Sequence, residues 1–119
     1  MNEAQMLHQA TQEALRGDYV VVSCYNLDHG KYLIEQLSQS VPEYMIKGTT
    51  FNPLKITLGT GNIQFVNVDS LEKACRGKRG AVFQLDLQER TWTQFSRFVR
   101  KEIPTRFARI LAESSTVIR

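Results

Sequence analysis

The chain has 119 residues, of which 42% are hydrophobic and 23% are charged, with a net charge of +3. This composition is that of one soluble globular domain over residues 1–119, and it excludes collagen, disordered chains and small disulfide scaffolds. No apolar run approaches the roughly 20 residues that cross a bilayer, and the first residues lack the basic and apolar regions of a secretory signal. We therefore expect a cytoplasmic protein with no membrane partner.

The charges are divided unevenly along the chain. Residues 1–72 carry 4 basic and 8 acidic side chains, net −4, whereas residues 73–119 carry 11 basic and 4 acidic ones, net +7. A segregation of this size bears on the partners of a protein and not on its fold. It points the C-terminal part of the chain toward phosphates or an acidic protein surface.

The first part of the chain alternates between helix and strand signals. Residues 2–16 have the apolar spacing of an amphipathic helix, with Asn2 placed to cap it. Its apolar stripe is expected to consist of Ala4, Leu7, Ala10, Ala14 and Leu15. The β-branched run Tyr19–Cys24 is typical of a central strand covered on both faces, as in parallel sheets. A second helix is predicted over 31–38, with Asp28 as its N-cap.

The middle of the chain carries turn and hairpin signals. Tyr44–Ile46 is a candidate short strand, and 48–53 is expected to be a loop because it contains glycine and proline. Two alternating runs, 55–58 and 63–68, are joined by the turn residues Gly59–Asn62. This pattern predicts a β-hairpin.

The last part of the chain is predicted to contain further helices and strands. Ser70 is expected to cap a short helix that ends near Arg76, and Ala81–Asp86 is a second strong strand. Apolar residues at helical spacing predict a helix over 91–103, whereas 106–119 fits a helix or a final strand, with the strand favoured. Strands and helices that alternate in this way favour an α/β fold, a three-layer sandwich with a mostly parallel central sheet and a β-hairpin.

Known catalytic and cofactor motifs are missing from the sequence. It contains no phosphate-binding loop, dinucleotide fingerprint, esterase elbow or zinc-protease motif. Cys24 and Cys75 have neither a CxxC partner nor a cluster of histidines, so both are expected to be free, buried or half-buried thiols. We therefore predict no cofactor and no metal, and the sequence favours a protein that is not an enzyme.

Two places hold side chains with possible chemical roles. The loop Cys24–His29 follows the first strand, where open α/β sheets bind their ligands. A Cys24 and His29 nucleophile pair is one interpretation, and a core cysteine beside a helix cap is the other. Asp86 ends a strand, from which it could hold Mg²⁺ or cap the following turn.

The basic residues of the C-terminal part are the most usable functional signal. They lie in the loop after the short helix and around the predicted last helix. The candidate nucleic-acid-binding or partner-binding residues are Arg76, Lys78, Arg79, Arg97, Arg100 and Lys101. Several cations on one face bind phosphates without sequence preference and with strong salt dependence. A solvated charged face without a ligand is the alternative.

Five short pieces of the chain follow a familiar order. They are the strand and polar loop 20–26, the hairpin 58–65, the helix end Arg76–Gly77, the strand 82–86 and the Ser/Thr-rich residues 114–116. This order resembles the ATPase core of phage terminase large subunits and related helicase-type P-loop NTPases, in which Asp86 would match the magnesium-binding residue. The phosphate-binding loop is missing, and Leu87 stands where that family has an acidic residue. The resemblance therefore implies a shortened, non-catalytic relative of viral origin.

One function and two alternatives follow from these observations. We expect a non-catalytic binding module that docks nucleic acid, or a nucleic-acid-processing complex, through its basic C-terminal face. The first alternative is a small inhibitor or adaptor that binds a host or viral protein. The second is an enzyme that uses Cys24 or His29.

Overall fold

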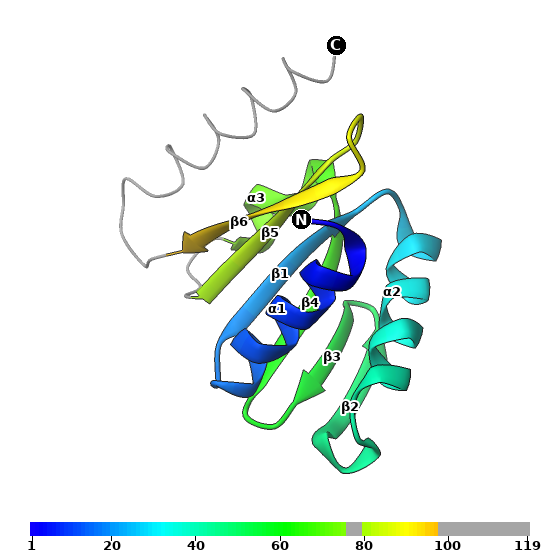
Figure 1. The fold of residues 1–119 in the computed structure, drawn as a ribbon, viewed down its shortest axis with the longest axis vertical. Helices are drawn as coiled ribbons and strands as arrows, with labels where there is room; N and C mark the ends of the chain where they lie inside the picture. Colours follow the sequence, from blue (N-terminus) through cyan, green and yellow to red (C-terminus); the bar gives the residue numbers. More distant parts are fainter. Residues whose placement is uncertain (76–79, 98–119) are drawn as a thin grey trace.

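The computed structural model describes residues 1–75 and 80–97, which form one mixed β-sheet and three α-helices (Figure 1). The strands are β1 (Tyr19–Cys24), β2 (Ile46–Phe51), β3 (Leu54–Leu58), β4 (Gly61–Asn67), β5 (Gly80–Asp86) and β6 (Thr91–Arg97). The helices are α1 (Glu3–Leu15), α2 (Leu27–Ser40) and α3 (Leu71–Cys75), with short 3-10 helices η1 (Glu43–Met45) and η2 (Val68–Ser70). No helix in these two ranges is long and apolar enough to cross a membrane.

The strands of the sheet lie in the order β2-β3-β4-β1-β5-β6. The two parallel pairs, β1–β4 and β1–β5, both include β1, whereas β2–β3, β3–β4 and β5–β6 are antiparallel. The prediction of a mostly parallel three-layer sandwich is therefore wrong. Its physical reason is the length of the connections, because two residues join β2 to β3 and β3 to β4, and four join β5 to β6. A parallel crossover needs a dozen or more residues.

Several predicted elements are confirmed. β1 is the central strand, β3 and β4 form the hairpin, and β5 matches the second strong strand. Asn2 caps α1 as expected, since its side chain accepts a hydrogen bond from the Gln5 N–H at 2.9 Å. The Gln5 side chain in turn accepts one from the Asn2 N–H, which completes a capping box.

The buried face of α1 differs from the predicted stripe. Met6, Ala10 and Ala14 are fully buried, whereas Leu15 is 40% exposed and Ala4 is also exposed. The end of α1 lies directly on the β3–β4 hairpin, where a Cβ on Gly61 would come within 2.0 Å of the Ala14 carbonyl oxygen. Only a residue without a side chain fits at position 61 against this end of α1, so the close approach places Ala14 and its face of the helix on the sheet.

The predicted helix from Thr91 is wrong over its first part, and its remainder lies outside the described residues. β6 pairs with β5 from Thr91 opposite Asp86 to Arg97 opposite Gly80. Trp92 and Phe95 have helical spacing but pack on opposite faces of the sheet. The four-residue turn after β5 brings this segment back along an open strand edge, where alternating threonine and aromatic residues pair well.

The shorter elements also differ from their predictions. β2 extends over residues that were expected to form a short strand at 44–46 and a loop at 48–53, and η1 precedes it. The helix that Ser70 was expected to cap begins at Leu71, after a 3-10 helix capped by Asn67. The expected last element, 106–119, lies outside the described residues.

The core lies mainly between the sheet and the two long helices. α1 and α2 lie side by side on one face, as Figure 1 shows, where Met6, Leu33 and Leu37 pack with buried residues of the strands. The short helix α3 lies on the other face, where Leu71 packs against Val21 and Val82. The first turns of α1 and α2 consequently come to the same end of the molecule.

Candidate functional site

The carboxyl ends of β1 and β5 carry the two places with chemical side chains that the sequence predicted, the Cys24–His29 loop and Asp86, and β4 ends beside them. Cys24 lies opposite Asn67 in the register, and β1 and β5 run parallel, so the segments after these strands emerge at one edge. Met1 ties α1 to this edge, because its amino group donates to the Trp92 carbonyl and its carbonyl accepts from the Trp92 N–H, both at 2.8 Å. Figure 1 shows the β1–α2 connection, the β5–β6 turn and the N-terminus at this end.

Cys24 is a core residue. It is 1% exposed, and its Sγ lies 3.3 Å from the Asn26 carbonyl oxygen and 3.2 Å from that of Val66. Burial raises the pKa of the Cys24 thiol to about 11. The thiol is therefore protonated at neutral pH and a poor nucleophile. As predicted, neither Cys24 nor the half-buried Cys75 is part of a disulfide.

Asn26, and not Asp28, caps α2. The Asn26 side chain accepts a hydrogen bond from the His29 N–H at 2.9 Å, so the helix begins at Leu27 and not at residue 31. Asp28 lies in the first turn, where its charge interacts favourably with the amino end of the helix. The prediction failed because two residues with good capping side chains stand close together in the loop, and the path of the chain selects the first.

Asp86 is used by the turn that follows β5. Its Oδ1 accepts hydrogen bonds from the Gln88 and Glu89 N–H groups at 2.9 and 3.0 Å. The turn-capping interpretation of Asp86 is thereby confirmed. Within the described residues, no three His, Cys, Asp or Glu side chains come together as metal ligands would.

His29 is the centre of an aromatic group that sequence reasoning missed. Its ring centroid lies 4.8 Å from that of Tyr25, 6.4 Å from Tyr32 and 6.2 Å from Trp92. The spacing of Tyr25 and Tyr32, four residues before and three after the histidine, is the signal that could have revealed it.

The charge state of His29 follows from its surroundings. Its Nδ1 accepts a hydrogen bond from the Tyr25 N–H at 3.1 Å, so the neutral ring carries its proton on Nε2, 3.8 Å from Glu3 Oε1. Burial lowers the pKa of His29, although the Glu3 carboxylate opposes this effect. His29 is therefore neutral at pH 7 and leaves the negative charge of Glu3 unbalanced.

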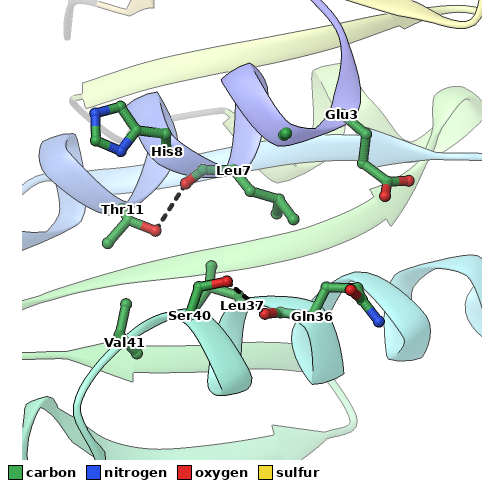
Figure 2. Close-up of a pocket in the computed structure, with 9 residues that line it drawn as sticks. Glu3, Leu7, His8, Thr11, Gln36, Leu37, Ser40 and Val41 are labelled. Atoms are coloured by element: carbon green, nitrogen blue, oxygen red, sulfur yellow. Dashed lines mark hydrogen bonds between the residues drawn. The ribbon is translucent and has the colours of Figure 1, made fainter.

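A groove of about 300 Å³ runs between the outer sides of α1 and α2 (Figure 2). Its floor is apolar, with the buried Leu37 and the partly buried Leu7 and Val41. Figure 2 shows the Glu3 carboxylate and the Gln36 amide together at one end of the groove. Glu3 thus belongs both to the groove and to the surroundings of His29.

The other polar side chains of the groove are engaged within their own helices. The Thr11 hydroxyl donates to the Leu7 carbonyl at 2.7 Å, and the Ser40 hydroxyl donates to the Gln36 carbonyl at 2.9 Å. His8 is exposed, and its ring points away from α2 in Figure 2. The Glu3 end is therefore the polar end of the groove that is open to a ligand.

Exposed hydrophobic side chains gather at the carboxyl edge of the sheet. Of the eight large ones among the described residues, six lie at this edge or near it: Met1, Tyr25, Leu27, Tyr32, Leu87 and Phe51, which by the strand register is level with Val22 of β1. Phe51 belongs to this group because it ends β2 beside α2, and the Lys31 Nζ lies 5.8 Å from the centre of its ring. The other two lie at the opposite ends of the long helices: Leu15 is the last residue of α1, and Tyr44 is in η1 after α2. We refer to the six residues as the apolar end.

Acidic side chains flank the apolar end. Six carboxylates lie in the first helical turns, in η2, at the end of β5 and in the β5–β6 turn, namely Glu3, Asp28, Asp69, Glu72, Asp86 and Glu89. Four cations lie in the same described segments, namely Lys31, Lys73, Arg90 and the Met1 amino group. Among the described residues, this end is therefore apolar and carries an excess of two negative charges.

The predicted basic face lies almost entirely outside the described residues. Five of its members, Arg76, Lys78, Arg79, Arg100 and Lys101, fall in residues 76–79 and 98–119. Arg97 is described only by its backbone, at the end of β6 opposite Gly80. The basic face therefore stays a prediction.

No family model, curated protein or solved structure matches the chain. The resemblance to terminase and helicase ATPase cores therefore gains no support and stays a prediction. Function has to be inferred from the chemistry of the site itself.

Proposed function

We propose that the chain is a non-catalytic binding module that docks a protein partner through its apolar end. The observation that carries this proposal is the gathering of six of the eight exposed large hydrophobic side chains at one end of the described structure. A contiguous apolar patch rimmed by polar groups is characteristic of a protein interaction site. Isolated exposed hydrophobic residues would be distributed over both ends.

The width of the apolar end supports a macromolecular partner. It extends from Phe51 at the end of β2 to Leu87 after β5, and these strands are separated by β3, β4 and β1. With adjacent strands roughly 4.8 Å apart, the patch is about 19 Å wide. That width suits the surface of another protein better than a small molecule.

The charge of the apolar end indicates the chemistry of its partner. Among the described residues its carboxylates outnumber its cations by six to four, so a partner surface with basic and apolar groups is complementary. The same carboxylates repel the phosphates of a nucleic acid. The buried, protonated Cys24 thiol and the engaged Asp86 carboxylate support a binding role over a catalytic one.

Nucleic acid is the second candidate partner. The observation in its favour is the net charge of +7 on residues 73–119, from 11 basic and 4 acidic side chains. Docking would then use Arg76, Lys78, Arg79, Arg97, Arg100 and Lys101.

Site-specific photocrosslinking separates these possibilities. A photoreactive amino acid replaces Leu27 or Phe51 at the apolar end, and Leu15 or Tyr44 at the opposite end as matched exposed controls. In cells that encode the chain, we expect discrete protein adducts from the first pair only, unchanged by nuclease. Equal adducts from both pairs, or none from the apolar end, would overturn the proposal.

A salt titration tests the second candidate separately. Fluorescence anisotropy with labelled single-stranded and double-stranded DNA is measured at several salt concentrations. A binding constant whose logarithm falls linearly with that of the salt concentration would support nucleic acid as a partner. No binding at low salt would remove it.

A further inference from the structure

We propose that the Glu3 end of the groove between α1 and α2 receives an arginine side chain of the protein partner, and that aliphatic residues next to this arginine lie along the groove. This inference rests on the proposed function and deepens it, because it names the chemistry of the docked segment. Three properties of the groove lead to it: an unbalanced carboxylate, exposed aromatic rings and an apolar floor of limited length.

The carboxylate of Glu3 lacks a cationic partner within the described residues. Its near neighbour is His29, whose Nε2 lies 3.8 Å away and whose ring is neutral at pH 7. The Gln36 amide lies at the same end of the groove and offers a further acceptor oxygen (Figure 2). A planar guanidinium with five N–H donors matches this set of acceptors better than a point-like ammonium does.

Exposed aromatic rings lie beside His29, the residue that faces this carboxylate. Tyr25 and Tyr32 are 38% and 46% exposed, and both stand next to His29. Tyr32 lies one helical turn before Gln36, so it extends the α2 wall of the groove beyond its polar end. A cation close to exposed aromatic faces is stabilised by their quadrupoles, and arginine makes such contacts more often than lysine.

The floor of the groove limits the number and the kind of residues that bind beside the arginine. It is lined by Leu7, Leu37 and Val41, and it runs along α1 from Glu3 to Thr11. Eight residues of helix at 1.5 Å each make this path about 12 Å long. At roughly 3.3 Å per extended residue, it accommodates three or four residues. The matching segment therefore has an arginine with two or three adjoining aliphatic residues.

The test uses a short peptide as the probe. The ¹⁵N-labelled chain is titrated with acetyl-Arg-Leu-Val-Leu-amide and, separately, with the same peptide carrying citrulline, which is isosteric with arginine but uncharged. We expect the arginine peptide to shift amide resonances of Glu3, His29, Tyr32 and Gln36, and the citrulline peptide to shift them at least tenfold less strongly at equal concentration. Equal effects of both peptides, or no effect of either, would overturn the inference.

Two charge-matched variants locate the interaction. Glu3→Gln is expected to weaken the arginine peptide by about tenfold or more, as for the loss of one charge-assisted hydrogen bond. Glu35→Gln removes the same charge from an exposed position of α2 that does not line the groove, and it should leave binding within about twofold. An equal loss of affinity for the arginine peptide in both variants would show general charge attraction and would refute Glu3 as the arginine-binding residue.

A third variant tests the aromatic contribution at an exposed position, where the substitution should not unfold the protein. Tyr32→Leu keeps an apolar side chain on an exposed helical position but removes the aromatic face, and it should weaken the peptide several-fold while preserving the spectrum of the free protein. Crosslinking at Leu27 separates this inference from the proposed function. Unchanged adducts in the Glu3→Gln protein would overturn the proposed arginine-binding site at Glu3 and leave the apolar end as the docking surface.

Discussion

Gly30 offers a sharp test of how α2 is seated on the sheet, because two opposing effects meet there. The residue is in the first part of α2, where replacing glycine by alanine favours the helix by about 1 kcal/mol at most. A Cβ at this position would lie 2.5 Å from Leu54 Cδ2, 3.3 Å from Cys24 Sγ and 3.4 Å from Phe65 Cβ. Leu54 is 4% exposed and has little room to move away.

Overpacking should therefore outweigh helix propensity in the Gly30→Ala variant. Inserting a methyl group into a well-packed core costs about 1–3 kcal/mol, so we expect a net loss of about 1 kcal/mol in the free energy of unfolding. Urea denaturation followed by far-UV circular dichroism measures this difference. A variant that is more stable than the wild type by about 1 kcal/mol would refute the close contact between α2 and β3.

The Leu54→Ala background turns this prediction into a double-mutant cycle. Leu54→Ala alone should cost about 2–5 kcal/mol because it opens a cavity beneath α2. In that background the shortest contact of the new methyl group is gone, so Gly30→Ala should become neutral or stabilising. The two changes should then be coupled by about 1–2 kcal/mol, whereas additive effects would show that the contact is absent.

Three further predictions concern the residues around the β1–α2 connection. Asn26→Ala should lower the free energy of unfolding by about 1 kcal/mol because it removes the cap of α2, and Asp28→Ala should lower it by less. Urea denaturation measures both changes. A larger loss for Asp28→Ala would show that Asp28 is the cap. Cys24 should react only slowly with iodoacetamide in the native protein, because with a pKa of about 11 only about one thiol in a thousand is ionised at pH 8. Peptide mass spectrometry measures the alkylation. Rapid alkylation of Cys24 in native buffer would contradict this prediction. The pKa of His29 is lower in the folded protein than in the unfolded chain, so protonation of this residue favours unfolding. The stability that the neutral His29 ring contributes is therefore complete above the unfolded pKa of 6.5. It is lost as the pH falls through the lower pKa of the folded state. His29→Gln should therefore flatten the fall of the melting temperature between pH 7 and pH 5, and identical pH profiles would contradict the neutral state of the ring.

Local signals in the sequence were reliable where one short segment decides the outcome. The cap of α1 depends on Asn2 and Gln5, which lie three residues apart, and the β3–β4 hairpin depends on its own glycine turn. The role of Asp86 follows from the two N–H groups directly after it. In each case the interacting groups are neighbours in the chain, so their chemistry can be read from the residue types.

The candidate site was only partly visible in the sequence. The loop after β1 was recognised as a place for function, and it does contribute Tyr25, Leu27 and His29 to the carboxyl edge of the sheet. Glu3 and Phe51 carried no such signal, since each is an ordinary residue in its own segment. They reach the site because α1 packs beside α2 and because β2 ends beside the same helix.

The sequence by itself determined that β1 is buried on both faces and that a hairpin joins β3 and β4, whereas a core position was only one of two interpretations of Cys24. Only the tertiary structure decided that residues 91–97 form a strand, which face of α1 is buried, and which polar and aromatic side chains share one end of the molecule. The physical reason is that these outcomes depend on partners far away in the chain. The open edge of β5 supplies hydrogen bonds to β6, and Gly61 supplies the room for α1. Such long-range pairing and packing outweigh the weak preferences of the local sequence.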